Sequence, residues 1–111
     1  MSEDRRILGE VVAAAESGRP VVLATIVRAR GSTPRGVGSR MLIDPVHGSI
    51  GTIGGGCGEA EVIDAARLAL EDGRPRLVQV DLTEDLYSWS PAVCGGVFDV
   101  LLEPVGSAPA A

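Results

Sequence analysis

Apolar residues recur with helical spacing in two stretches of this chain. In the first stretch they share one face and glutamates lie away from it, which predicts a helix over residues 3–17. Gly18 can end that helix, because glycine readily adopts the left-handed conformation found after a helix. Residues 59–70 show the same spacing and precede Gly73, which predicts a second helix. The apolar positions of the two helices are Ile7, Leu8, Val11, Val12, Ala15, Val62, Ile63, Ala66, Ala69 and Leu70.

Short apolar runs outside these helices predict β-strands. The first run is nearly continuous and rich in β-branched residues, which is typical of a strand covered on both faces. The second and third runs flank a polar turn and are expected to form a hairpin. The order of elements predicts an α+β (or α/β) fold, with two main helices packed on a mixed β-sheet of about five strands. The predicted strands cover residues 21–27, 40–43, 49–53, 77–82 and 97–102.

A chain of 111 residues suits a single domain. That domain is predicted over residues 1–104, and the tail at 105–111, rich in Ala and Pro, is expected to be disordered. The chain holds one Phe, one Tyr and one Trp, so the core must be built mainly from aliphatic side chains. Such a core is modest, and a homo-oligomer that buries more apolar surface is therefore expected.

The formal net charge is −5 and the pI is about 4.7, with acidic residues spread along the chain. This balance argues against nucleic-acid binding, which calls for a basic surface. No apolar run approaches the roughly 20 residues needed to cross a bilayer, and the charged N-terminus does not resemble a secretion signal. A cytoplasmic protein is predicted, in which Cys57 and Cys94 are reduced thiols rather than a disulfide.

The segment Gly54-Gly55-Gly56-Cys57 joins a strand-like stretch to the second predicted helix. Three glycines allow a tight turn and a close approach to a ligand, and the free N–H groups at a helix start attract anions. A thiol beside them should be partly ionised. The segment is therefore a candidate anion cradle with a soft ligand beside it. A simple strand-to-helix turn with a buried cysteine explains it equally well.

Two other loops carry related chemistry. In Gly31-Ser32-Thr33-Pro34-Arg35 the proline stiffens the chain, Ser32 and Thr33 supply hydroxyl groups, and Arg35 supplies a guanidinium suited to phosphate. Taken alone, this loop is better explained as a rigid turn with a solvated arginine. Cys94-Gly95-Gly96 combines a thiol with glycines just before the last predicted strand. A shared site requires all three loops to meet at one edge of the sheet.

Taken in order, these motifs resemble the N-terminal domain of the XdhC/CoxI family. The resemblance is carried by the strand at residues 22–27, the loop at 31–35, the segment Gly51-Thr52-Ile53-Gly54-Gly55-Gly56-Cys57, and Cys94-Gly95-Gly96. It extends from the first helix to about Pro104. Family members commonly continue into a Rossmann-like domain, and this chain stops before it, so any function of that domain is expected to be absent or supplied by a separate Rossmann-like subunit. Gly58 stands where the family usually has a larger apolar residue, which is expected to loosen the helix start.

The resemblance implies an accessory protein, not an enzyme, that serves molybdenum hydroxylases such as xanthine dehydrogenase or carbon monoxide dehydrogenase. Family members bind the molybdenum cofactor (molybdopterin), hold it during sulfuration and help to insert it into the apo-enzyme. A hydroxylase apo-enzyme and a cysteine desulfurase are the partners implied. Cys57 is the implied contact to the metal. The cofactor-binding residues would be Ser32, Thr33, Pro34, Arg35, Gly54, Gly55, Gly56, Cys57, Cys94, Gly95 and Gly96.

Two other functions remain open at this point. The chain could be a thiol-dependent sulfurtransferase or redox protein that uses Cys57, with Cys94 as the resolving thiol. No histidine or lysine stands near either cysteine in the sequence to act as a general base, which weakens that alternative. The chain could also be a nucleotide-binding or structural subunit whose glycines serve only as turns.

Overall fold

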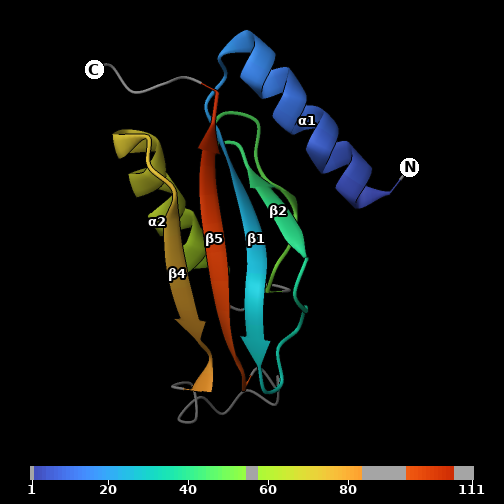
Figure 1. Cartoon of the computed structure of the whole chain (residues 1–111), viewed down its shortest axis with the longest axis vertical. Helices are drawn as coiled ribbons and strands as arrows, with labels where there is room; N and C mark the ends of the chain where they lie inside the picture. Colours follow the sequence, from blue (N-terminus) through green and yellow to red (C-terminus); the bar gives the residue numbers. More distant parts are fainter. Residues whose placement is uncertain (1, 55–57, 84–94, 107–111) are drawn as a thin grey trace.

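The computed structural model describes residues 2–54, 58–83 and 95–106 (Figure 1). Five strands form one sheet in the order β3-β2-β1-β5-β4, and every neighbouring pair is antiparallel. The α+β fold with two helices and five strands is confirmed, although the sheet is antiparallel instead of mixed. The elements are α1 (Glu3–Ser17), β1 (Val21–Arg30), β2 (Arg40–Ile43), β3 (Ile50–Gly51), α2 (Glu59–Asp72), β4 (Arg76–Asp81) and β5 (Val97–Val105).

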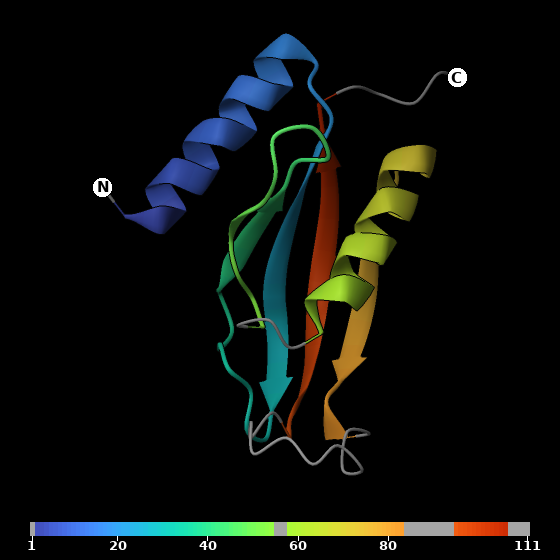
Figure 2. The same ribbon diagram turned by 180° about the vertical axis from the view of Figure 1, so that it is seen from behind.

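One face of the sheet is covered by α2 (Figure 2). This helix connects β3 at one edge of the sheet to β4 at the other, so it lies across the central strands. Its apolar face and the facing side of the sheet form the larger core, which is aliphatic except for Phe98. The buried members of this core are Val22, Ala24, Ile26, Met41, Ile43, Ile53, Val62, Ala66, Val80, Leu82, Phe98, Val100 and Leu102.

The opposite face is covered by α1 only near one end. Ile7 and Ala14 of the helix are fully buried there against Val21 and Leu42 of the sheet. The start of β1 is therefore covered on both faces, as its apolar run predicts. Further along, alternate residues of β1 are open to solvent, beginning with the partly exposed Thr25. The rest of this face, called the open face below, has no covering element within the described residues.

The last strand is longer than the sequence suggested. Its predicted end is Leu102, but β5 runs to Val105, because the ten residues of β1 supply partners as far as Val21. Pro104 is tolerated because β4 begins opposite Leu102, which leaves Pro104 with a neighbouring strand on one side only. The expected boundary at residue 104 therefore falls inside a strand, and residues 107–111 lie outside the described part.

Asp44 holds the predicted turn between β2 and β3. Its carboxylate is buried, and Oδ1 accepts hydrogen bonds from the backbone N–H groups of Val46 and His47 at 2.9 and 3.0 Å. Oδ2 lies 3.1 Å from His47 Nδ1 and 3.3 Å from Nη1 of Arg19. The other terminal nitrogen of that guanidinium, Nη2, donates to Glu10 at 2.7 Å. One carboxylate thus joins the hairpin turn to the segment between α1 and β1.

Gly58 has a steric role at the start of α2 that the sequence did not suggest. It is the residue before the helix, with φ of 74°, and a Cβ atom there would lie 2.5 Å from Cγ1 of Val80. Leu82 and Phe98 are also close to that position. A side chain at residue 58 would therefore both strain the backbone and push α2 away from β4 and β5.

Replacing Asp44 with Asn should lower the free energy of unfolding at neutral pH. Burial raises the pKa of the Asp44 carboxyl, but hydrogen bonds from His47 and Val46 outweigh it, so this pKa lies below its ordinary value. The charged form therefore stabilises the fold above an unfolded pKa of about 3.9, and this contribution is lost as the pH falls through the lower folded value. Urea unfolding from neutral to acid pH should show the difference between wild type and D44N shrinking in that window. An exposed control, D64N, should track wild type; equal pH profiles for all three would contradict the assignment.

Replacing Gly58 with Ala should destabilise the protein by about 2–4 kcal/mol, the combined effect of a left-handed backbone and an overpacked contact. Chemical denaturation measures the loss. Gly9, inside α1, is the matched control, because a Cβ added there would meet nothing within 4 Å. G9A should be neutral or stabilising by up to about 1 kcal/mol, because alanine favours the helix. Equal stabilities of G58A and G9A would rule out the steric role of Gly58.

Candidate ligand-binding rim and cavity

β1 and β4 end, and β5 begins, at the same end of the sheet (Figure 1). There the Gly31–Arg35 loop and Gly95-Gly96 touch through their backbones, and together they are called the rim below. The Gly95 N–H donates to the Ser32 carbonyl at 3.2 Å. A Cβ on Gly96 would lie 2.6 Å from the Arg30 carbonyl oxygen, and one on Gly31 would lie 3.3 Å from the Gly96 Cα. The contact expected between these two loops is confirmed, and glycine is what permits it.

Thr33 shapes the rim from inside. Its hydroxyl donates to the Arg35 carbonyl at 2.9 Å, and its methyl group packs where a Cβ on Gly96 would be. The hydroxyl group therefore donates its proton within the loop, and the role of Thr33 is to position the backbone that carries Arg35. The neighbouring Ser32 and Pro34 are exposed.

For the third loop, the glycine turn at residues 54–57, the structure describes the chain on either side. Gly55, Gly56 and Cys57 lie outside the described residues, as does Cys94, while Gly54 is buried. The flank after the turn begins at Gly58, packed on Val80, Leu82 and Phe98. The Leu82 N–H donates to the carbonyl of Gly96 at 2.9 Å. Leu82 therefore connects Gly58, on this flank, to Gly96 of the rim.

The flank before the turn reaches the same region through a cavity of about 450 Å³. Its walls come from the start of α1, from the loop between β1 and β2, and from Thr52, two residues before Gly54. Arg35 therefore faces a space that it shares with the flank of the glycine turn. The lining residues are Ser2, Glu3, Asp4, Arg35, Val37, Gly38, Ser39, Arg40 and Thr52.

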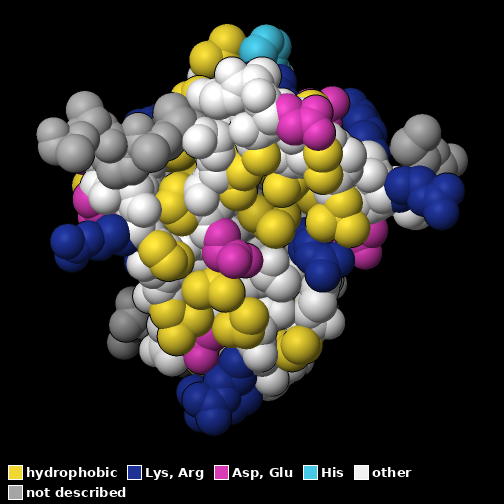
Figure 3. All heavy atoms as spheres, turned by 45° about the horizontal axis from the view of Figure 1, so that its top comes forward, with side chains coloured by type: hydrophobic (Ala, Val, Ile, Leu, Met, Phe, Trp, Pro, Cys, Tyr) yellow, Lys and Arg dark blue, Asp and Glu magenta, His cyan; other side chains and the backbone are white. Residues whose placement is uncertain are grey.

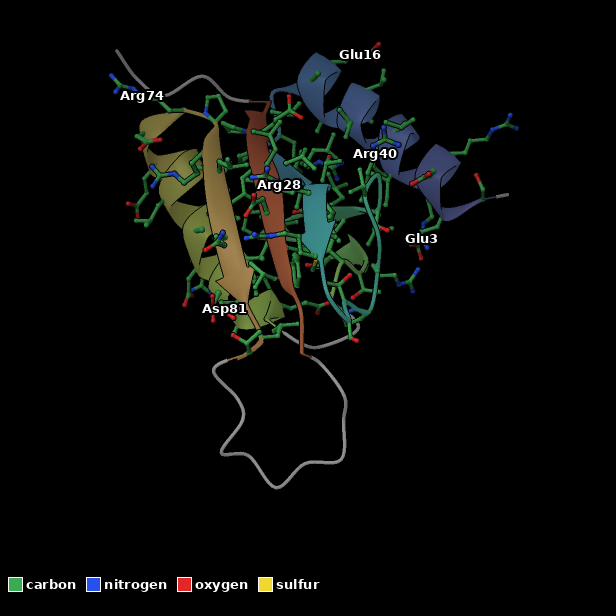
Figure 4. The ribbon with its side chains drawn as sticks, turned by 60° about the horizontal axis from the view of Figure 1, so that its bottom comes forward. Glu3, Glu16, Arg28, Arg40, Arg74 and Asp81 are labelled. Carbon is green, nitrogen blue, oxygen red and sulfur yellow. The ribbon has the colours of Figure 1, made fainter. Side chains whose placement is uncertain are left out.

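The cavity carries both signs of charge. Arg40 lies 3.7 Å from the Asp4 carboxylate, a loose and exposed ion pair. Arg35 has no ion-pair partner in the described part of the chain, so its guanidinium is free to bind an anion. Figure 4 shows Arg40 and Glu3 on this side of the molecule. Sequence reasoning missed Arg40, because it reads as the first residue of a strand.

The start of α2 is less suited to an anion than the glycine pattern suggested. Glu59 and Glu61 occupy its first turn and already compensate the helix dipole. The Thr52 hydroxyl donates to the Glu59 carboxylate, which joins the two flanks of the glycine turn. An incoming phosphate would meet these carboxylates, so the unpaired Arg35 is the more favourable anion contact.

Within residues 2–54, 58–83 and 95–106, no three His, Cys, Asp or Glu side chains gather closely enough to hold a metal ion. None of the helices described there is long and apolar enough to span a membrane.

A model of the XdhC and CoxI family matches residues 14–81, which is more than half of the chain. The chain therefore belongs to this family. It is 34% identical over 103 residues to YqeB, an uncharacterized protein of Escherichia coli (strain K12), covering 93% of this chain and 19% of YqeB. It is also 34% identical over 92 residues to a protein of Bacillus subtilis (strain 168) named as a probable xanthine dehydrogenase subunit, covering 81% of this chain and 28% of that protein.

The fold agrees with a solved relative. A crystal structure described as a xanthine dehydrogenase from Bacillus halodurans matches with a TM-score of 0.73 and 34% sequence identity. The match covers 94% of this chain and 30% of that one. The chain thus spans less than a third of each of these three relatives.

Replacing Gly96 with Ala should separate the two loops of the rim and cost about 1–3 kcal/mol, because a Cβ would overlap the Arg30 carbonyl and Thr33. Gly95 gives an adjacent control, since a Cβ there meets nothing within 4 Å. Amide hydrogen exchange of residues 31–35 should speed up in G96A and stay unchanged in G95A. Equal protection in both variants would mean that the loops do not depend on this contact.

Proposed function

We propose that this protein is an accessory factor, without turnover of its own, that binds the molybdenum cofactor as cargo. It assists sulfuration of the cofactor and its insertion into a molybdenum hydroxylase of the xanthine dehydrogenase or carbon monoxide dehydrogenase type. The hydroxylase apo-enzyme and a cysteine desulfurase are its proposed partners, in the cytoplasm. Membership of the XdhC and CoxI family supports this proposal, as does the relative named as a probable subunit of xanthine dehydrogenase.

The observation that carries the proposal is Arg35, which lines the cavity beside the rim and has no ion-pair partner within the described ranges. Molybdopterin presents a phosphate and a planar pterin, and a guanidinium binds phosphate through charge-assisted hydrogen bonds. The cavity of about 450 Å³ falls within the usual range for small-molecule sites. Carboxylates of Glu3 and Asp4 on the same cavity can accept hydrogen bonds from the N–H groups of a pterin ring.

The rim supplies rigidity to this site. Thr33 and the close backbone contact with Gly96 hold the loop that carries Arg35, so little conformational entropy is lost when a ligand binds. Cys57 is proposed to approach the molybdenum, as a soft thiolate does. The thiol-transfer alternative depends on Cys57 and Cys94, which lie outside the described residues, and no observation favours it over cargo binding.

Purification from a host that makes the cofactor tests the proposal. Wild-type protein should release a fluorescent pterin after acid oxidation, in an amount measured per mole of protein. Arg35→Ala should reduce that amount, because loss of a charge-assisted hydrogen bond costs about 1.5–3 kcal/mol, roughly a tenfold to hundredfold loss of affinity.

Arg67→Ala is the matched control, because Arg67 is an exposed arginine of α2, away from the cavity. It should retain the wild-type amount of pterin. A wild-type protein that neither carries nor takes up the pterin would end the proposed function. Equal retention by the R35A and R67A proteins would instead remove Arg35 from the site.

A further inference from the structure

The open face of the sheet can be read as rows of residues that lie side by side on neighbouring strands. The first row contains Arg30, Val97 and Asp81, and the second contains Arg28, Asp99 and Gln79. The third row contains Arg40, Thr25, Leu101 and Leu77. In the fourth row Glu103 lies beside Leu23, which packs against the residues under α1 and marks the limit of the open face. These residues point away from the core under α2, because their neighbours along each strand belong to that core.

Charge is divided across these rows. The basic side chains, Arg28, Arg30 and Arg40, lie on β1 and β2, whereas the acidic ones, Asp81, Asp99 and Glu103, lie on β4 and β5. Figure 4 shows Arg40 toward one side of the sheet and Asp81 toward the other, with Arg28 between them. Arg28 and Arg30 form no ion pair with any residue in the described ranges.

Apolar side chains lie between these charges. Leu77 is 62% exposed and Val27, at the bulge in β1, is 44% exposed. On α1, Leu8 and Val12 are 45% and 55% exposed beside the buried stripe of that helix. Figure 3 shows apolar side chains gathered on this side of the molecule, with charged groups among them. Large side chains exposed together in this way mark an interaction surface.

We propose that a second copy of this chain covers the open face. A two-fold axis between β1 and β5, parallel to the strands and in the interface, places β1 of each copy over β5 of the other. Each basic half then faces an acidic half, while a surface of one sign would repel its copy. The division of charge is thus self-complementary, which favours a copy over an unrelated partner. This inference does not rest on the proposed cargo, because Arg28 and Arg30, whose charges the test reverses, do not line the cavity.

Two charge-reversed proteins test the pairing. Arg28→Glu with Arg30→Glu leaves Arg40 as the one basic side chain among the residues of these rows, and Asp99→Arg with Glu103→Arg leaves Asp81 as the one acidic side chain among them. Sedimentation equilibrium should give a wild-type dimer, and each variant alone should dissociate with a constant raised roughly tenfold or more. An equimolar mixture of the two should associate again, with an affinity near that of wild type.

The control protein carries Arg67→Glu and Arg74→Glu, which change the net charge as much as the acidic variant does but lie outside the open face. It should dimerise like wild type. Circular dichroism checks that each variant is folded, and if one is not, Arg28→Gln or Glu103→Gln replaces it and should weaken the dimer in the same direction. A wild-type monomer at every concentration, or folded variants whose mixture stays monomeric, would overturn the proposal.

Discussion

The antiparallel pairing of β1 with β5 is the interaction on which the other features of this molecule depend. These two strands form the centre of the sheet and pair along nearly their whole length, from Val21↔Val105 to Arg30↔Val97. At one end the pairing brings the loop after Arg30 against Gly96 and forms the rim. At the other end it brings Gly106 against the segment between α1 and β1, where a Cβ would lie 1.8 Å from the Arg19 carbonyl oxygen. The rim of the candidate site and the charged rows of the open face both follow from this one register.

The placement of charge decides which part of the site suits an anion. A glycine turn at a helix start is a favourable anion site in general. In this protein Glu59 and Glu61 stand in that first turn, and Glu59 also accepts the hydrogen bond from Thr52. On the cavity that joins the loop to the flank of the glycine turn, Arg35 supplies a positive charge with no ion-pair partner among the described residues. Recognition of a phosphate would therefore rest on an arginine held by a rigid loop.

The small core and the open face have the same cause, because two helices are too few to cover both faces of a five-stranded sheet. Within the described residues, α2 covers one face of the sheet over β1, β4 and β5, and α1 covers the other face only near the start of β1. The uncovered part keeps apolar groups such as Leu77 in water, which costs free energy that an association would recover. Such a surface can still select one orientation of a second copy, because opposite charges such as those of Arg28 and Asp99 lie on neighbouring strands and attract their counterparts only when the two copies are turned correctly.

The sequence by itself determined the local elements, because their signals lie within a few neighbouring residues. Helical spacing before Gly18 predicted α1 at its observed bounds, and the hairpin of β2 and β3 follows from its apolar runs around a polar turn, although β3 is shorter than predicted. Motif order also identified the family. Only the tertiary structure decided that every strand pair is antiparallel, that Arg40 and Thr52 share a cavity with Arg35, and that Gly58 must be a glycine. These features depend on contacts between residues far apart in the chain, and such contacts exist only once the register of β1 on β5 has been set.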